Sequence, residues 1–420
     1  MESFVLRGSY IWSESPRELV LKPRAYGVCD ENGCCAGVFD ALPERYAALP
    51  LRDLGEALIV PGYSDLHTHA AQYRDIGLGM DMTLIEWLDG LTYPEEARFA
   101  EADFAREVYG RFAAELRTGF TTRAAIFASA HREGTEILME LLEQTGLHTL
   151  VGKVNMDRSA PDYIRERDAA SALADTERWL RETARFQNTK PILTPRFVPS
   201  CTPELLTGLG RLAEQRGLPV QSHLDETPEE VAWVRELCPD SESYAAVYDA
   251  AELLGPQTVM AHCIYMTDAE CALMKERSAF IAHCPSSNAN VRSGIAPIRK
   301  YLDMGLNIGL GTDISGGSSL DMADAVRDAL SASRLLWRLG EEHWPHLHAR
   351  EAFYLATAGG GAYFGKVGKF APGYAFDAVA VDDGAWSGGD ETLEVRFHKM
   401  IYRARSANVV SKYVNGRRLF

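Results

Sequence analysis

The stretch Pro61-Gly62-Tyr63-Ser64-Asp65-Leu66-His67-Thr68-His69 follows a short apolar run, Leu58 to Val60, and carries two histidines two positions apart. Side chains at positions i and i+2 of a strand point to the same side, so both imidazoles can bind one ion. A His-x-His pair is weak evidence by itself, because many such pairs lie on protein surfaces. The stretch decides the fold only together with the residues that follow the later apolar runs.

The middle of the chain repeats a strand followed by a helix. Segments of helical length with a 3.6-residue apolar period, such as Glu101 to Arg117 and Met322 to Arg338, separate the apolar runs. Thr202-Pro203 and Thr227-Pro228 are typical helix starts. Eight buried strands alternating with helices predict an α/β fold, a (β/α)8 TIM-type barrel, with an open doubly wound sheet as the alternative. The expected strands are 58–60, 122–127, 149–154, 191–194, 218–221, 258–261, 279–282 and 307–310.

Polar residues follow these runs, at the end of a barrel where active sites form. Five of the 11 histidines take such positions, and an aspartate follows the eighth run. Imidazoles are not needed to fill a barrel, so their convergence indicates a metal site and favours the barrel over the open sheet. Neutral imidazoles with one carboxylate suit zinc. The residues at these positions are His67, His69, Arg196, His223, His262, His283 and Asp313.

Glu226 stands three residues after His223 and is the candidate proton shuttle. A carboxylate near a metal site can carry protons, provided that it is not itself a ligand. The alternative is a helix-capping acid, because Thr227-Pro228 follows directly. Asp225 is nearer to His223 in the sequence, but strand alternation directs it to the other side.

Both ends of the chain are rich in strand signals, whereas the middle is not. We therefore expect a small β-sandwich domain, built from both ends, beside the barrel. The strands expected there include Phe4–Leu6, Tyr10–Trp12, Asp377–Val381, Val395–Phe397 and Ser411–Val414. The expected boundaries are residues 1–60 and 371–420 for the small domain and 61–370 for the barrel.

The composition argues against several classes of partner. Lys and Arg number 43 and Asp and Glu number 59, so the net charge of −16 repels nucleic acid. The apolar runs are too short to span a bilayer, and the N-terminus lacks the pattern of a signal peptide. The eight cysteines have no disulfide-framework spacing. We expect a cytoplasmic protein that binds a small molecule and neither nucleic acid nor membrane.

A series of longer stretches adds to the Pro-Gly-x-x-Asp-x-His-x-His opening at residues 61–69. They are Gln72-Tyr73, 84–88 (Leu-Ile-Glu-Trp-Leu), 92–99 (Thr-Tyr-Pro-Glu-Glu-Ala-Arg-Phe), 151–157, Thr194-Pro195-Arg196-Phe197, Gln221-Ser222-His223, 259–262, 281–285 and 309–313. Together they resemble the amidohydrolase superfamily of metal-dependent hydrolases and, within it, the guanine deaminase family. The resemblance runs from about Arg7 to the C-terminus.

This resemblance implies a set of metal ligands and proton carriers. The ligands would bind one zinc ion per subunit, with ferrous iron as the alternative metal. His262 would lie beside the attacking water, Glu226 would relay its proton to the purine ring, and Asp313 would act as both ligand and base. The implied ligands are His67, His69, His223 and Asp313.

The resemblance also implies a substrate and an assembly. Gln72, Arg196 and Phe197 are similar to the family's base-recognition residues, and Trp87 offers a further apolar face for stacking. The implied activity is hydrolytic deamination of guanine to xanthine and ammonia, in purine catabolism or salvage, by a homodimer. The alternatives are a related deaminase acting on a pterin or another aminopurine and a non-catalytic scaffold, which would be expected to lack ligands.

Overall fold

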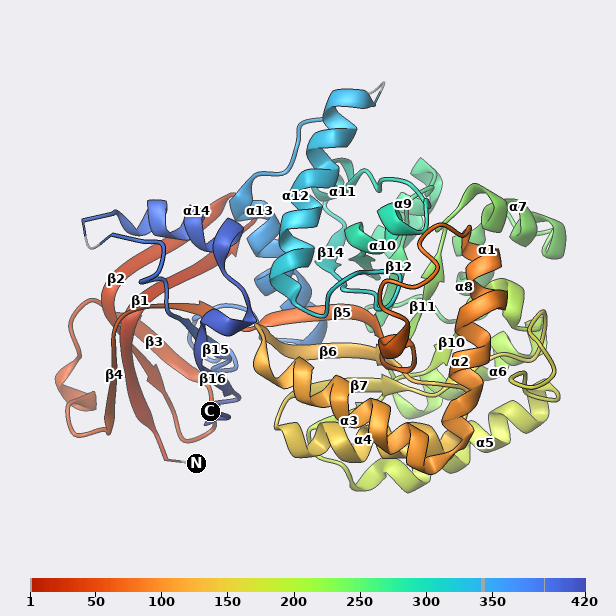
Figure 1. The fold of residues 1–420 in the computed structure, drawn as a ribbon, viewed down its shortest axis with the longest axis horizontal. Helices are drawn as coiled ribbons and strands as arrows, with labels where there is room; N and C mark the ends of the chain where they lie inside the picture. Colours follow the sequence, from red (N-terminus) through yellow and green to blue (C-terminus); the bar gives the residue numbers. More distant parts are fainter. Residues whose placement is uncertain (1, 341–343, 389) are drawn as a thin grey trace.

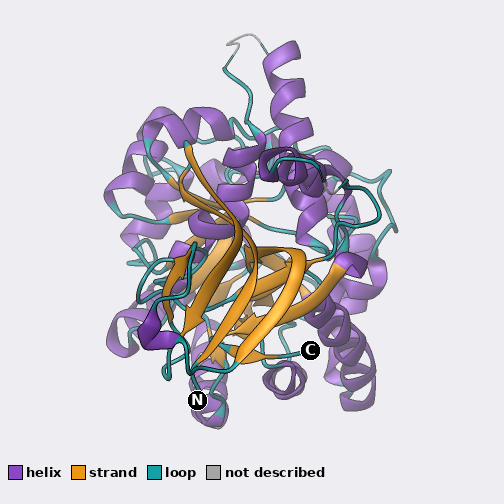
Figure 2. Cartoon of the chain, turned by 90° about the vertical axis from the view of Figure 1, so that its left-hand side faces the viewer, coloured by secondary structure: helices purple, strands orange, loops and turns teal. Residues whose placement is uncertain are grey.

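The computed structural model describes residues 2–340, 344–388 and 390–420. A barrel of parallel strands surrounded by helices occupies most of the molecule, and a second sheet lies at one side of it (Figure 1). The second sheet combines the two ends of the chain. In the view turned by 90°, the strands of this sheet face the viewer and the helices surround them (Figure 2).

The barrel sheet has eight strands in the order β11-β12-β13-β14-β5-β6-β7-β9, and the ladders between them are parallel. A parallel bridge from Leu193 to Val220 joins the β9 edge to β11 and closes the ring. The closed barrel is thereby confirmed over the open sheet. Its strands are β5 (Tyr63–His69), β6 (Thr121–Phe127), β7 (His148–Gly152), β9 (Thr189–Pro191), β11 (Val220–Leu224), β12 (Thr258–His262), β13 (Phe280–His283) and β14 (Asn307–Leu310).

Helices follow the strands as the apolar period predicts, and two begin at the expected Thr-Pro pairs. Thr202 caps α6 and Thr227 caps α7, each accepting a hydrogen bond from a backbone N–H of the first turn. The helices are α1 (Leu84–Trp87), α2 (Tyr93–Ala97), α3 (Ala102–Thr118), α4 (Arg132–Thr145), α5 (Ala169–Glu182), α6 (Pro203–Arg216), α7 (Pro228–Leu237), α8 (Tyr244–Ala250), α9 (Asp268–Glu276), α10 (Pro285–Asn290), α11 (Ile298–Met304), α12 (Met322–Leu339), α13 (Ala349–Tyr354) and α14 (Leu393–Arg403).

Shorter helical segments continue or link these elements. Two strands, β8 (Val154–Asn155) and β10 (Thr194–Pro195), pair with each other at the barrel mouth. The 3₁₀ segments are Glu44–Tyr46, Ala70–Asp75, Arg98–Ala100, Thr183–Arg185, Val198–Ser200, Ala362–Phe364 and Ser406–Asn408, and the π-helical segments are Leu88–Thr92 and Leu355–Gly359.

The second sheet has seven strands in the order β17-β16-β15-β4-β1-β2-β3. It has its own apolar core, in which the aromatic rings of Phe4, Tyr10, Phe370 and Phe376 are buried. The small β domain from both chain ends is thus confirmed, as one continuous sheet. Its strands are β1 (Phe4–Ser15), β2 (Glu18–Cys29), β3 (Cys35–Phe39), β4 (Leu51–Pro61), β15 (Ala378–Val381), β16 (Val409–Val414) and β17 (Arg417–Arg418).

Two of the expected strands are wrong in detail. Leu58 to Val60 lies on β4 and pairs with β15 of the small sheet, so the first barrel strand is β5, which carries the two histidines itself. Val395 to Phe397 belongs to α14, which buries one helical face, including Phe397 and Met400, and is capped by Thr392. Three residues are too few to separate a strand period from a helical one.

The domain boundaries at residues 60 and 370 stay a prediction. Among the residues that the structure describes, each helix is too short or too polar to cross a bilayer.

Candidate metal centre and active site

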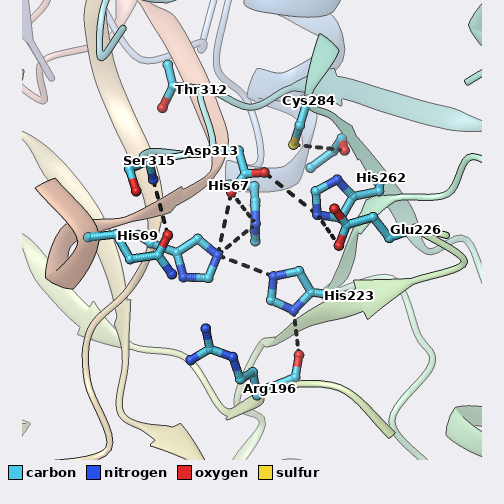
Figure 3. Close-up of polar contacts among 12 residues, drawn as sticks. His67, His69, Arg196, His223, Glu226, His262, Cys284, Thr312, Asp313 and Ser315 are labelled. Atoms are coloured by element: carbon cyan, nitrogen blue, oxygen red, sulfur yellow. Dashed lines mark hydrogen bonds and ion pairs between the residues drawn. The ribbon is translucent and has the colours of Figure 1, made fainter. Parts of the chain in front are cut away.

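Five of the predicted metal-site residues meet at the mouth of the barrel (Figure 3). His67 and His69 lie on β5, His223 on β11 and His262 at the end of β12, while Asp313 follows β14. Each of these residues is at most 9% exposed. Because the carboxyl ends of the strands meet at one rim, positions far apart in the sequence bring their side chains together.

Their ligating atoms are close enough to share one ion. His69 Nε2 lies 3.1 Å from His67 Nε2 and 3.2 Å from His223 Nε2. Asp313 Oδ1 lies 3.2 Å from His67 Nε2 and 3.6 Å from His69 Nε2. Three ring nitrogens and one carboxylate oxygen therefore face a common point.

The chemical state of these groups fits a divalent metal. His223 Nδ1 donates a hydrogen bond of 2.5 Å to the backbone oxygen of Arg196, which leaves a lone pair on Nε2. Burial and the neighbouring imidazole of His67 lower the pKa values of His69 and His223 well below their usual range. Neutral imidazoles are the form that binds metal, and nitrogen donors with one carboxylate suit zinc.

Two more side chains lie beside this set. Both His262 and Cys284 offer an atom within 4.8 Å of a carboxylate oxygen of Asp313. Burial raises the pKa of the Cys284 thiol well above its usual value, so the thiol stays protonated and is a poor ligand. His262 Nδ1 is 2.8 Å from Asn288 Oδ1, which fixes its ring. His283, the remaining strand-end histidine, lines a separate cavity.

Glu226 faces His262 rather than capping a helix. Glu226 Oε2 is 3.4 Å from His262 Nε2, and Oε1 accepts a hydrogen bond of 3.0 Å from Ser293 Oγ. Burial raises the pKa of Glu226 to about 7. The cap of α7 is Thr227, so the capping alternative is wrong.

Neighbouring charges shift the pKa values of two further groups, Asp313 and His262. Although burial favours its neutral form, Asp313 has a pKa well below the usual range because His67 and other imidazoles stabilise the carboxylate. Burial also opposes the charged form of His262, but the carboxylates of Glu226 and Asp313 raise its pKa. The centre thus holds an ionised aspartate beside a glutamate that can carry a proton at neutral pH.

A buried carboxylate ties two of the ligand-bearing segments together. Asp65 Oδ1 accepts hydrogen bonds from the backbone N–H groups of His67 and Thr312, and Oδ2 accepts one of 2.5 Å from Thr312 Oγ1. A Cβ on Gly311 would lie 2.9 Å from His67 Cβ, so glycine allows the β14 segment to approach β5 this closely. The spacing between His67 and Asp313 follows from these contacts.

A pocket that is partly open to solvent lies over the metal-site residues. All four predicted substrate-binding residues line it: Gln72, Trp87, Arg196 and Phe197. Leu84, Leu88 and Val291 add apolar surface, and Ser287 and Gly316 complete the wall. Apolar faces with a few converging polar groups are typical of a small-molecule site.

Sequence reasoning missed the residues that hold the site's polar groups. Glu96 accepts hydrogen bonds from Gln72 and Arg196, Asn288 contacts His262 and Ser293 contacts Glu226. Glu96 lies within the 92–99 stretch that carried the resemblance, which was its one available signal. The sequence gives no sign that this carboxylate is buried.

Comparisons with known proteins agree with this architecture. The model of the amidohydrolase family matches residues 58–419. The guanine deaminase of Dictyostelium discoideum is 37% identical over 402 residues, covering 93% of this chain and 86% of its own, and that of Homo sapiens is 34% identical over 440 residues, covering 99% and 96%. A solved structure of guanine deaminase from C. acetobutylicum, with guanine bound in the active site, is 40% identical with a TM-score of 0.96 over 100% of both chains.

This chain belongs to the amidohydrolase family. Within that family, the three relatives described above, which it matches along most of their length, are guanine deaminases.

Proposed function

We propose that this protein is an enzyme that hydrolyses guanine to xanthine and ammonia, a reaction of purine catabolism and salvage. The observation that carries the proposal is the meeting of three imidazoles and a carboxylate beneath a pocket lined by Gln72 and Arg196. The similarity to guanine deaminases over nearly the whole chain supports the choice of substrate.

We propose that one zinc ion per chain is held by His67, His69, His223 and Asp313, with ferrous iron as the alternative metal. The mutual distances of their ligating atoms and the neutral state of the imidazoles support this set. A metal bound there would supply the Lewis acidity that activates water at neutral pH.

Asp313 and Glu226 carry out the proton transfers in this proposal. The ionised carboxylate of Asp313 accepts a proton from the attacking water. Glu226, whose pKa is about 7, donates a proton to the ring nitrogen next to C2. The proton held by Asp313 then passes to the amino group, which leaves as ammonia, and Glu226 takes up the proton of the new hydroxyl as the carbonyl forms. His262, held by Asn288, orients the water. Guanine and water are thereby converted to xanthine and ammonia, with no net change in protons on the enzyme.

The pocket side chains recognise the base. The Arg196 guanidinium donates to the ring carbonyl, and the amide of Gln72 can both donate to and accept from the purine edge. Phe197 and Trp87 stack on or enclose the ring faces. The pocket needs no excess positive charge, because guanine is neutral.

A panel of substrates tests the proposal. Ammonia release is measured from the metal-loaded protein with guanine, adenine, cytosine, isoxanthopterin and a chloro-s-triazine. We expect release from guanine alone. Release from isoxanthopterin or another aminopurine in place of guanine would establish the alternative substrate class, and a metal-loaded protein that acts on none of them would favour the non-catalytic alternative.

We also propose that the protein is a cytoplasmic homodimer. All eight cysteines lie in the described part of the chain and are free thiols, which supports a reducing compartment. Light scattering on the purified protein tests the dimer, and a mass of one chain would contradict it.

A further inference from the structure

Glu96 is a buried carboxylate that contacts both of the polar side chains to which we assign recognition of the base. It lies on α2, and its side chain is 0% exposed. Glu96 Oε1 accepts a hydrogen bond of 2.9 Å from Gln72 Nε2, and Glu96 Oε2 accepts one of 2.6 Å from Arg196 Nη1. A single side chain therefore holds Gln72 and Arg196 in place.

Only a carboxylate satisfies this arrangement. Two N–H donors converge on residue 96, and an ionised carboxylate offers two acceptor oxygens and no hydrogen. The backbone N–H of Ser315 donates to Gln72 Oε1 at 3.1 Å, which fixes the other end of the Gln72 amide. A glutamine at position 96 would turn its own NH2 group toward either Gln72 Nε2 or Arg196. Glu96 thus sets which face of the Gln72 amide is presented to the pocket.

The carboxylate of Glu96 also neutralises the buried positive charge of Arg196. Arg196 is 3% exposed, and its guanidinium carbon lies 5.1 Å from the ring of Tyr93, on the same helix as Glu96. An unpaired guanidinium in such a place would attract anionic rings strongly, because charges interact more strongly away from water. Paired with Glu96, Arg196 offers N–H donors to the base without net positive charge.

We infer that Glu96 is the positioning residue that makes the pocket selective for an uncharged purine and against an anionic one. The inference rests on the proposed function, because it assigns Gln72 and Arg196 to the base. Glu96 acts through these two side chains and is not a catalytic residue.

The experiment compares Glu96→Gln with Glu95→Gln as the matched control. Glu95 is the adjacent residue on the same helix and pairs with Arg98 and Arg74 instead. Guanine kinetics and metal content are measured for each protein. Calorimetry then gives the Kd values of xanthine and hypoxanthine at mildly alkaline pH, where xanthine is largely a monoanion and hypoxanthine is largely neutral.

We expect Glu96→Gln to raise KM for guanine about 10- to 100-fold, the effect of losing a hydrogen bond to a charged group. The metal content stays at the wild-type level, and most of kcat is retained. The ratio of the Kd of xanthine to the Kd of hypoxanthine falls at least about fivefold, because Arg196 is now unpaired and attracts the anionic ring. Glu95→Gln keeps the wild-type values. Glu96→Asp, which retains charge and both acceptors, weakens guanine binding but keeps the preference for the neutral ring.

A double variant distinguishes the effect of the unpaired charge from a general structural effect of the substitution. Adding Arg196→Gln to Glu96→Gln removes the unpaired charge, so the preference for xanthine is expected to disappear even though guanine activity is lost. An unchanged ratio of the two Kd values in Glu96→Gln, or a preference for xanthine that persists in the double variant, would overturn the inference. Wild-type protein that releases no ammonia from guanine would instead overturn the proposed function.

Discussion

Glu226 is a buried acid that reaches both His262 and the pocket. It lines the pocket, lies 3.4 Å from His262 Nε2 and has a pKa of about 7, because burial disfavours its charged form. A group with this pKa can give up and regain a proton within one turnover at neutral pH. In the proposed reaction its carboxyl group transfers a proton, which an amide of the same shape cannot do.

We expect Glu226→Gln to bind metal normally and to lower kcat about 10²- to 10⁴-fold, the usual contribution of general acid–base catalysis. Elemental analysis and steady-state ammonia release measure the two effects. Glu229→Gln, an exposed residue in the first turn of α7, is the control and keeps full activity. A Glu226→Gln enzyme with wild-type turnover would rule out the assigned role.

The site residues at strand ends were predictable from the sequence, whereas the side chains that hydrogen-bond to them were not. His223 and Asp313 follow apolar runs that form barrel strands, so the barrel geometry alone places them together, whereas the run before His67 belongs to β4 of the small sheet. Asn288 and Glu96 have no such marker, since neither residue type nor spacing reveals which polar groups become buried beside a given histidine or arginine. Both residues lie on short helices, α2 and α10, whose position over the barrel the sequence pattern does not determine.

The helices around the barrel approach one another closely at glycine positions. A Cβ on Gly210, in α6, would lie 1.8 Å from the backbone oxygen of Ala251, at the end of α8. Backbone cannot move aside as the end of a flexible side chain can. By contrast, a Cβ on Gly110, in α3, would meet none of the described atoms within 4 Å.

We therefore expect opposite effects from two Gly→Ala substitutions in helices. Gly210→Ala lowers the free energy of unfolding by about 1–3 kcal/mol through overpacking. Gly110→Ala raises it by up to about 1 kcal/mol through helix propensity. Urea unfolding of the three proteins measures both. Equal stability of the two variants would contradict the close contact between α6 and residue 251.

Elements with a long apolar period were predictable, whereas short runs were ambiguous. Met322–Leu339 and Ala102–Thr118 agree with the expected helices to within a residue or two, because many turns contribute to the period. Leu58 to Val60 was correctly expected as a strand but assigned to the wrong sheet, since the sequence does not say which neighbour a strand pairs with. Val395 to Phe397 failed because a three-residue window fits both periods.

An ion pair and several hydrogen bonds join the C-terminal strands of the small sheet to the barrel. The Arg123 guanidinium, on β6, pairs with Asp377 at 2.7 Å and donates to Asn415 at 2.6 Å. Lys412 Nζ, on β16, donates to the backbone oxygens of Arg117 and Thr121 at 2.7 and 2.9 Å. These contacts explain how segments from opposite ends of the sequence become one unit.

Lys412 makes this junction sensitive to pH. Burial and the nearby charge of Arg117, opposed by Asp321, lower the pKa of Lys412 to about 7. The unfolded chain keeps this proton up to about pH 10. Between these values the unfolded state binds more protons than the folded state, so rising pH stabilises the fold through Lys412.

The Lys412→Met variant lacks this titration. We expect the free energy of unfolding of the wild type, relative to that of Lys412→Met, to increase by up to about 1.4 kcal/mol per pH unit above pH ~7. Chemical denaturation at several pH values measures the difference. The exposed residue Lys366 gives the control, because Lys366→Met should differ from the wild type by a constant amount. A flat difference for Lys412→Met would show that its amine keeps the proton when buried.

We propose above all that four residues from three strands of a closed barrel, β5, β11 and β14, hold one divalent ion, and anomalous X-ray diffraction from crystals of the purified protein tests this directly. We expect one anomalous peak per chain, about 2.0–2.2 Å from Nε2 of His67, His69 and His223 and from a carboxylate oxygen of Asp313. No peak between these four residues in crystals of protein that deaminates guanine, or an ion bound elsewhere in the pocket, would contradict it.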